Sequence, residues 1–452
     1  MLKTLSIEQY KGFYQTQTVV FAIPDGTKNG SGLTLIVGPN NTGKTTIIES
    51  LLITTEKKFK ESERHSSISP VIKITNHSGT TSEFTNVVNG SVIQNVGQPH
   101  DIKFELLPSR RFWAHEFRGA TDFPSFVSDS SGPDVRKLDS FNLGPLLRTI
   151  LLDADARGRF DEILKRLMPH FTSWTIDTND AGADYIKYKT QQTYHQSNML
   201  GDGVISLFRI AAHLVHDQVS TFIIDEPELS LHPTAQKRLA QLLSELSKHK
   251  QVIVCTHSPY FANWEDFTNG SKVIRLNKHK DVQCTVSSLD NTKDYGSFIA
   301  TSTAEYQRPQ LIDTTAKEIL FSDRILFVEG QEDVGLFRRW SRDNGVQLNF
   351  EIFGYGVGGE QNMKLFLELA QDLNIERVGA LYDQNSTSFP ADELNYPSYK
   401  LLRHTAEDIR DKKDPSGVIT RSGLFTSDGV IKPASQAEFS SLVNTYINYF
   451  SA

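Results

Sequence analysis

The segment GPNNTGKT, residues 38–45, constrains the fold of this chain more than any other feature. It has the pattern G-x-x-x-x-G-K-[ST] and lies between an apolar stretch, LTLIV, and a helix-like stretch, TTIIESLLIT. A strand, a glycine-containing loop and a helix in this order form the setting in which the pattern binds nucleotide phosphates. Gly38 and Gly43 let backbone amides face phosphate oxygens. Lys44 reaches the β- and γ-phosphates, and Thr45 is placed to bind Mg²⁺.

Two later motifs follow apolar strands and complete the predicted ATP site. In TFIIDEPELSLHP, Asp225 ends the strand and is expected to hold Mg²⁺, while Glu226 polarises the attacking water. In VIVCTHSP, His257 is placed to contact the γ-phosphate or the water. The strand, helix and strand between these motifs are typical of a parallel sheet. The residues expected to contact ATP or its metal ion are Gly38, Asn40, Asn41, Gly43, Lys44, Thr45, Thr46, Asp225, Glu226 and His257.

Length and composition indicate a folded protein with more than one domain. The chain has 452 residues, 38% of them hydrophobic and 22% charged, so it can bury at least two cores. Its net charge of -7 means that any nucleic-acid contact must use a local basic patch. The two cysteines, Cys255 and Cys284, are interpreted as buried apolar side chains in a reducing compartment. The sequence contains neither a signal-peptide segment nor a membrane span, so we expect a cytoplasmic protein without membrane contact.

The α/β pattern is interrupted and then resumes. Residues 57–99 predict peripheral hairpins, with a turn at Asn89 and Gly90, and residues 141–171 predict two helices within a helical arm or dimerisation insert at about 135–195. The role of Arg110 and Arg111, a phosphate or DNA contact or a solvated pair, is left open. We expect one domain over residues 1–305 and a smaller α/β domain over residues 306–452.

The second domain carries acidic residues at strand ends. RILFVEGQEDVGLF places Glu329 after a strand and Asp333 at the start of a helix, where both can converge on one hard cation. VGALYD ends in Asp383, and Asn385 follows two residues later. Between these motifs, FGYGVGGEQN supplies glycines that allow close backbone approach.

The amino-terminal motifs resemble ATP-binding-cassette (ABC) ATPases of the structural-maintenance and DNA-repair type over roughly residues 1–300. IEQYKGF matches their opening strand, LSLHP lies where their D-loop lies, and SNMLGDGVISLF is similar to their signature segment. The resemblance implies that Leu200, Gly201, Asp202 and Gly203 meet ATP held by a second subunit. Gly201 replaces the usual Ser of the family, which removes a hydroxyl donor but leaves backbone amides at a helix start. ATP-driven dimerisation with slow turnover is therefore expected.

The later acids resemble a TOPRIM fold, whose pattern is a strand-end Glu followed by D-x-D. Asn385 replaces the second Asp, so metal affinity should fall and the site is expected to rely also on Asp333, Glu407 or Asp408. Glu407 and Asp408 resemble the late acidic pair of nuclease-type TOPRIM domains, although an exposed, charged helix end is the alternative interpretation. The candidates to stabilise a phosphoryl transition state are Lys412, Lys413 and Lys432.

The combination of the two domains resembles the OLD (overcoming lysogenization defect) family of ATP-dependent endonucleases over nearly the whole chain. The resemblance implies ATP and Mg²⁺ or Mn²⁺ as cofactors, DNA as substrate, and a homo-oligomer that is a dimer or a dimer of dimers. It also implies a role in antiphage defence, including as a retron effector with a reverse transcriptase and its DNA as partner. The metal ligands implied for the second site are Glu329, Asp333, Asp383, Asn385 and Glu407, with Glu329 and Asp383 as catalytic residues.

Three other functions remain to be compared with this one. An ATPase switch with a TOPRIM scaffold that binds DNA or a partner without cutting is the main alternative, and metal-dependent cleavage separates it from a nuclease. A primase or topoisomerase lacks an assured catalytic tyrosine context or an accompanying domain here. A transporter cassette would leave the later acids without a role.

Overall fold

The computed structural model divides the chain into two compact units. The first is formed mainly by Met1–Val286 and the second mainly by Ser287–Ala452. The boundary predicted after residue 305 lies outside the residues that the structure describes and stays a prediction. No helix in the described part of the chain is long and apolar enough to cross a membrane. The described residues are 1–56, 69–86, 93–97, 104–109, 143–180, 182, 184–196, 201–215, 219–279, 283–304 and 316–451.

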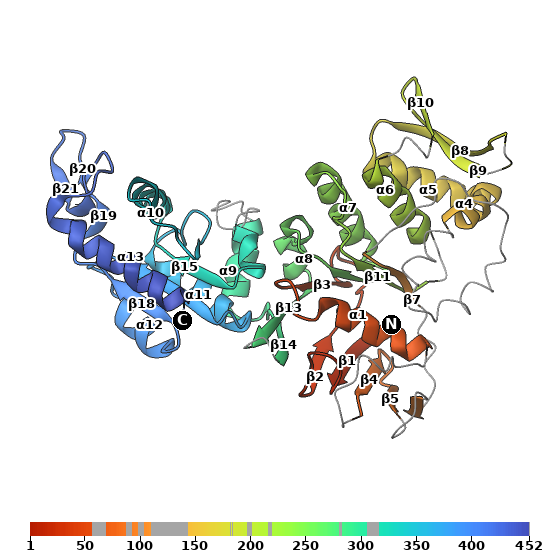
Figure 1. Ribbon diagram of the computed structural model, residues 1–452, viewed down its shortest axis with the longest axis horizontal. Helices are drawn as coiled ribbons and strands as arrows, with labels where there is room; N and C mark the ends of the chain where they lie inside the picture. The colour runs from red at the N-terminus through yellow and green to blue at the C-terminus, as the bar shows by residue number, and fades with distance from the viewer. Residues whose placement is uncertain are drawn as a thin grey trace. The chain divides into compact units, whose positions relative to one another are not determined.

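A six-stranded sheet forms the centre of the first unit (Figure 1). Its strands follow the order β14 (Gln283–Ser288), β13 (Lys272–His279), β3 (Leu33–Val37), β12 (Gln251–Cys255), β11 (Thr221–Asp225) and β7 (Phe104–Leu107). From β13 to β7 all neighbouring strands are parallel. Every residue of β3, β11 and β12 is buried, as expected for central strands of a parallel sheet. The carboxyl ends of these strands therefore meet at one edge.

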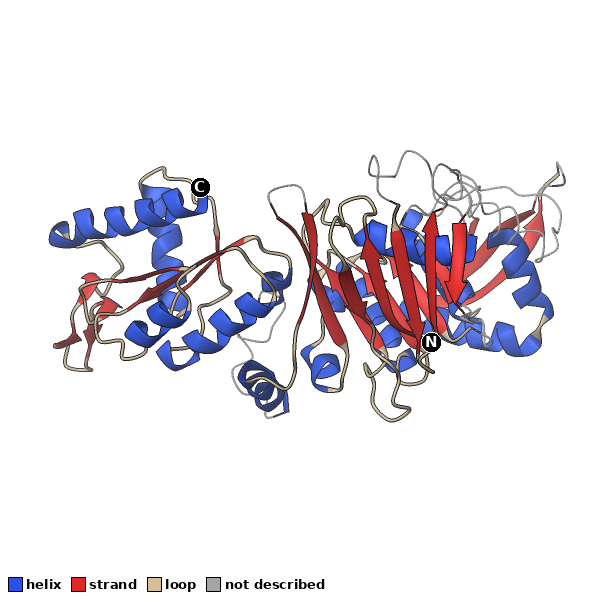
Figure 2. Ribbon diagram, turned by 90° about the horizontal axis from the view of Figure 1, so that it is seen from below, coloured by secondary structure: helices blue, strands red, loops and turns tan. Residues whose placement is uncertain are grey.

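An antiparallel sheet packs against this centre. Its order is β2 (Gln17–Val20), β1 (Leu2–Glu8), β4 (Val71–Asn76), β5 (Thr81–Asn86) and β6 (Ile93–Gly97). Helix α1 (Lys44–Glu56) contributes Ile47 and Leu51 to the core that also holds Leu5 of β1 and Ile36 of β3. Figure 2 shows the strands of the chain in red and its helices in blue. The predicted hairpins correspond to β4, β5 and β6, but Asn89 and Gly90 lie outside the described residues.

Gln251 joins the two sheets through its side-chain amide. The amide nitrogen donates to the carbonyl oxygens of Leu2 (2.7 Å) and Ala22 (2.8 Å). The amide oxygen accepts from the Leu2 N–H (2.8 Å) and the Thr221 hydroxyl (3.0 Å). Because Gln251 is fully buried, water cannot take the place of its side-chain amide as the hydrogen-bond partner of these groups.

The predicted arm at 135–195 is only partly helical. Within it lie α4 (Leu143–Leu152) and α5 (Ala154–Leu167), followed by an antiparallel sheet of β8 (Phe171–Thr178), β9 (Asp184–Thr190) and β10 (Thr193–Gln196). The prediction of a helical insert up to residue 195 is therefore wrong for the residues of β8, β9 and β10. In β9, side chains alternate between buried and part-exposed, the period of a half-buried strand. This sheet and the two helices enclose Phe208 of α6 (Asp202–Leu214) in an aromatic cluster.

A four-stranded parallel sheet forms the second unit. Its order is β16 (Glu351–Ile352), β15 (Arg324–Phe327), β17 (Arg377–Tyr382) and β18 (Lys400–Arg403). Phe327 of β15 packs on Phe366 of α11 (Met363–Asp372), while Leu326 packs in the cluster that holds α10 (Gln331–Asp343) and α13 (Gln436–Ser451). The alternation of side chains along β15 therefore places helices on both faces.

The remaining elements surround these sheets. The first unit also contains α7 (Pro233–Leu246) and α8 (Trp264–Thr268). The second also contains α9 (Asp294–Ala304), α12 (Phe389–Asn395) and two small sheets, in which β19 (Asp408–Arg410) pairs with β22 (Gly423–Phe425) and β20 (Lys412–Lys413) pairs with β21 (Ile419–Arg421).

Replacement of Gln251 by Ala should destabilise the first unit strongly. It would leave the Leu2 N–H and the carbonyls of Leu2 and Ala22 buried without their partner. We expect the free energy of unfolding, measured by urea denaturation of the full chain, to fall by about 3 kcal/mol or more. Gln241→Ala, at an exposed position of α7, is the matched control and should change it by less than about 0.5 kcal/mol. Equal effects of the two substitutions would contradict this role of Gln251.

Candidate nucleotide and metal sites

The predicted phosphate loop joins β3 to α1. Gly38 and Gly43 have φ angles of 134° and 99°, in the region that favours glycine. Asn40, Asn41 and Thr45 are exposed along this loop, whereas Thr46 is buried. Lys44 begins α1 with its side chain largely buried. Burial lowers the pKa of Lys44 to about 8, against the effect of the nearby Glu226 and Asp225 carboxylates. The loop and the end of β11 are therefore close enough for their charges to interact.

Asp225, Glu226 and His257 lie where the parallel strands end. Asp225 is the last residue of β11 and is buried. The Glu226 N–H donates to the Cys255 carbonyl (2.8 Å), and its Oε1 lies 3.7 Å from His257 Nε2. Burial and then the charge of Lys44 lower the pKa of His257, which favours a neutral ring. The structure thus brings together the two residues for which catalytic roles at the ATP site were predicted.

Glu228 also lies at the predicted ATP site, although the sequence analysis did not identify it. Its carboxylate accepts hydrogen bonds from the Thr256 hydroxyl (2.8 Å) and the His257 N–H (2.6 Å). Burial raises its pKa, although these hydrogen bonds act in the opposite direction. Glu228 therefore fixes the backbone at His257. The third acid of the DEPE segment was the available signal.

The predicted signature segment begins α6. Gly201 is the N-cap residue in an extended conformation, and Asp202 starts the helix; Leu200 lies outside the described residues. A Cβ atom at Gly203 would lie 2.4 Å from the carbonyl oxygen of Ser230. The signature segment therefore packs directly on the predicted D-loop. Contact between this segment and ATP bound to a second subunit stays a prediction.

Glu329 follows β15 and reaches the end of the neighbouring strand. Its Oε1 accepts a hydrogen bond from the Asp383 N–H (3.1 Å). Burial, and then the charge of Asp383, raises the pKa of Glu329 to about 7. Asp333, in the first turn of α10, accepts a hydrogen bond from the Gly330 N–H (2.7 Å) and caps the helix. Burial raises the pKa of Asp333 to about 8.

His404 orients Asp383 and was not predicted. Its Nε2 lies 2.8 Å from Asp383 Oδ1, while its Nδ1 accepts a hydrogen bond from the Ala406 N–H (3.3 Å). A ring that accepts at Nδ1 carries its proton at Nε2 when neutral, so we assign the Nε2–H as donor to Asp383. The ring is fully enclosed, with a side-chain exposure of 1%. No sequence motif surrounds this histidine, which follows β18 in RHTAEDIR.

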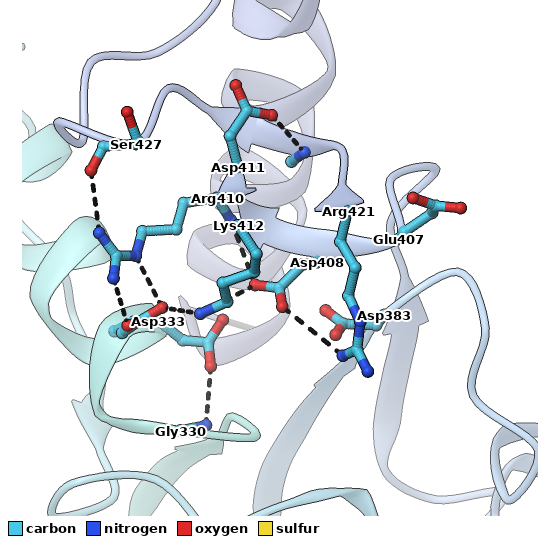
Figure 3. A network of polar contacts seen from close by, with 12 residues as sticks. Gly330, Asp333, Asp383, Glu407, Asp408, Arg410, Asp411, Lys412, Arg421 and Ser427 are labelled. Carbon is cyan, nitrogen blue, oxygen red and sulfur yellow. Dashed lines mark hydrogen bonds and ion pairs between the residues drawn. The ribbon is translucent and has the colours of Figure 1, made fainter. Parts of the chain in front are cut away.

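Asp408, rather than Glu407, joins this group of acids. Its charge acts on both Glu329 and Asp333, and its carboxylate lies 3.6 Å from Lys412 and 4.0 Å from Arg421. Figure 3 shows Asp333, Asp383 and Asp408 directed into one region and Glu407 turned away. Glu407 is exposed and accepts a hydrogen bond from the Ser422 N–H (3.0 Å).

Three further residues were predicted for the second site: Asn385, Lys413 and Lys432. Asn385 is exposed in the turn after β17. Lys432 pairs with Asp411 (2.6 Å), and Lys413 is exposed.

The glycine-containing segment 354–359 lies against the residues that follow β15. A Cβ atom at Gly356, where φ is 81°, would lie 2.7 Å from the backbone of Gly330. The Gly359 N–H donates to the Glu329 carbonyl (2.9 Å). Glu360, also missed, accepts hydrogen bonds from the N–H groups of Thr387 (2.6 Å) and Ser388 (2.8 Å). It thereby holds the segment that follows Asn385.

The acid group has the donor chemistry of a divalent-cation site. Glu329, Asp383 and Asp408 offer only oxygen atoms, which Mg²⁺ and Mn²⁺ prefer. Their mutual repulsion is the kind that a bound cation relieves. Among the residues that the structure describes, no three His, Cys, Asp or Glu side chains already stand in a metal-binding arrangement.

The folds and sites define a chain in which a P-loop ATPase domain is joined to a TOPRIM domain. Residues 33–263, just over half of the chain, match the family model described as "AAA domain, putative AbiEii toxin, Type IV TA system". Residues 320–384 match "Overcoming lysogenization defect protein-like, TOPRIM domain". The chain therefore belongs to the AAA-domain family of the first model and carries an OLD-like TOPRIM domain.

Several known proteins are similar to this chain. An OLD nuclease of Thermus scotoductus (strain ATCC 700910 / SA-01) is 29% identical over 205 residues, which cover 42% of this chain and 35% of the relative. The endonuclease GajA of Bacillus cereus (strain VD045) is 27% identical over 176 residues, which cover 38% and 28%. The chain thus spans about a third of the length of these relatives. An SMC head domain from Thermotoga maritima has 16% identity and a TM-score of 0.40, covering 64% of this chain and 99% of that domain.

The contact between Gly203 and Ser230 gives a test of the signature segment. A methyl group at position 203 has to displace a backbone carbonyl, so Gly203→Ala should lower the free energy of unfolding by about 1–3 kcal/mol. Gly158→Ala, in α5, meets no atom within 4 Å and should raise it by up to about 1 kcal/mol. Thermal unfolding of the two variants measures the difference. A stabilising Gly203→Ala would show that the helix start does not depend on this contact.

Proposed function

We propose that this chain is an ATP-regulated, divalent-metal-dependent DNA endonuclease. The observation that carries the proposal is the acid group at the carboxyl edge of the second sheet, where Glu329 accepts a hydrogen bond from the backbone of Asp383. The relatives named as nucleases, and the match to an OLD-like TOPRIM domain, support the same function. Among the described residues, Glu329, Asp383 and Asp408 are proposed to hold the metal ions.

The chemistry required of this site is hydrolysis of a phosphodiester. Bound Mg²⁺ or Mn²⁺ supplies the charge that activates water and stabilises the leaving oxygen. The chain provides the oxygen ligands and their orientation: the His404 ring donates to one oxygen of Asp383 and leaves the other available. Asn385 is proposed to add a neutral oxygen ligand, and Asp333 to contribute the oxygen that does not cap α10.

The amino-terminal site is proposed to bind and hydrolyse ATP. The loop from Gly38 to Thr46 surrounds the phosphates, Thr45 and Asp225 hold Mg²⁺, and Glu226 polarises the attacking water. The backbone amides at Gly201–Gly203 are proposed to meet the γ-phosphate held by a second copy of the chain. Closure of this homo-oligomer would regulate access of DNA to the metal site.

The proposed setting is antiphage defence in the cytoplasm. Its support is the description of the TOPRIM match as "Overcoming lysogenization defect protein-like". We extend the proposal to a homo-oligomeric effector, a dimer or a dimer of dimers, that works with a defence partner such as a retron reverse transcriptase and its DNA.

A second candidate function is an ATPase switch that binds DNA or a partner without cutting it. One observation favours it: Asn385 lacks the charge of an Asp ligand. The two candidates differ in one outcome, which is metal-dependent cleavage by the purified protein.

Nicking of supercoiled plasmid DNA in Mg²⁺ or Mn²⁺ tests the nuclease. We expect Glu329→Gln and Asp383→Asn to reduce nicking to background, because each removes a charged oxygen ligand. Glu393→Gln, at an exposed position of α12, is the matched control and should nick at the wild-type rate. Nicking that persists in both site variants would exclude this assignment, and a wild-type protein that binds DNA but never nicks it would favour the switch.

Glu226→Gln tests the ATP site. Loss of the carboxylate should slow ATP turnover by about 100-fold or more while leaving ATP binding intact, because the amide cannot polarise the water. The variant should therefore accumulate as an ATP-bound dimer, measured by retained nucleotide and by light scattering. Glu245→Gln, in the exposed pair with Arg166, is the control. Unchanged turnover in Glu226→Gln would contradict the assignment.

A further inference from the structure

A bidentate ion pair lies beside the acid group of the second unit. Arg410 donates from Nε to Glu332 Oε2 (2.8 Å) and from Nη2 to Glu332 Oε1 (2.6 Å). Lys412 pairs with the same carboxylate. Two cations thus share one anion. Figure 3 shows Lys412 directed to Asp408 and the Arg410 side chain extending to Ser427.

The geometry of this pair is also the geometry of phosphate recognition. A guanidinium group binds carboxylate and phosphate oxygens through the same two parallel N–H donors. The Glu332 side chain is 31% exposed and that of Arg410 is 34% exposed, so solvent and solutes reach the contact. Because the contact is partly exposed, a phosphate group can reach the same donors and compete with the carboxylate for them.

The ion pair of Arg410 and Glu332 lies next to the proposed metal site. Glu332 precedes Asp333 in the first turn of α10, and Lys412 Nζ lies 3.6 Å from Asp408. A polynucleotide carries a phosphate at every nucleotide, so a chain cleaved at the acid group presents further phosphates nearby. The chain has a net charge of -7, which makes a local basic group necessary for such a contact.

We propose that Arg410 and Lys412 form a binding site for a backbone phosphate of the nucleic acid, and that Glu332 occupies this site until the substrate displaces it. The inference rests on the proposed function for the identity of the substrate. Glu332 then acts as an internal competitor. The alternative is a permanent ion pair that only fastens β19 and β20 to α10.

The first experiment measures DNA binding without cleavage. Fluorescence anisotropy of labelled duplex DNA in EDTA gives the dissociation constant of the full chain. Glu332→Gln should bind about 3- to 10-fold more tightly, because the competing carboxylate is gone. Asp343→Asn is the matched control, since Asp343 lies on the same helix and also pairs with arginine. An equal gain in both variants would show a general charge effect and overturn the proposal.

The second experiment combines the substitutions. Lys412→Gln and Arg410→Gln should each weaken binding, and each should reduce the slope of log K against log salt by about one. The gain from Glu332→Gln should shrink when Arg410 or Lys412 is already replaced, because the competition is lost. Arg410 also donates to the Ser427 carbonyl (2.9 Å), so Lys412→Gln provides the test if Arg410→Gln fails to fold. A gain that persists unchanged in the Lys412→Gln background would overturn the proposal.

These measurements separate the phosphate site from the nuclease. DNA binding with the expected variant pattern, but no cleavage in Mg²⁺ or Mn²⁺, would leave the phosphate site in place and reject the nuclease. Cleavage by a protein whose binding ignores Glu332, Arg410 and Lys412 would keep the nuclease and reject the phosphate site. Absence of DNA binding by the wild type and by every variant would reject the phosphate site directly.

Discussion

Burial of carboxylates, with their mutual repulsion added to it, is the constraint that sets the properties of the acid group in the second unit. Glu329 and Asp333 are held close to Asp383 and Asp408 although burial already disfavours their charged forms. The pKa of Glu329 rises from 4.5 to about 7, so the folded protein binds this proton more tightly than the unfolded chain. Stability is therefore lost as the pH rises through that interval. Clusters of this kind are common at functional sites, and a bound cation would offset the repulsion.

Both units solve the placement of acids in the same way. In each unit a central parallel strand of mostly buried residues has a carboxylate at its end: Asp225 is the last residue of β11, and Asp383 directly follows β17. A second group then fixes the position. Glu228 holds the backbone at His257, and the His404 ring holds Asp383. Because these contacts come from neighbouring strand ends, the register of the sheet sets the geometry of each site.

The sequence predicted the local structure correctly where a site residue lies at the end of an apolar strand. The strands before Gly38, Asp225, Glu329 and Asp383 are continuous apolar runs, and the structure confirms them as strands. Contacts between residues distant in sequence carry no such pattern. The pairing of His404 with Asp383 and the binding of segment 386–388 by Glu360 depend on tertiary packing. The strands after Leu167 were missed because the helical spacing was examined only over residues 141–171, and the residues up to 195 were assigned to the same insert without a test of their own period.

The choice between adjacent acids shows why spacing alone is insufficient. Glu407 and Asp408 are neighbours, and in a strand neighbouring side chains point to opposite faces. Asp408 begins β19 and is buried, whereas Glu407 precedes the strand and is exposed. Within the pairing of β19 with β22, Asp408 lies opposite Gly423, and its charge acts on Glu329 and Asp333. Asn385 is neutral, and a charged residue in its place would add to the repulsion between Glu329 and Asp383.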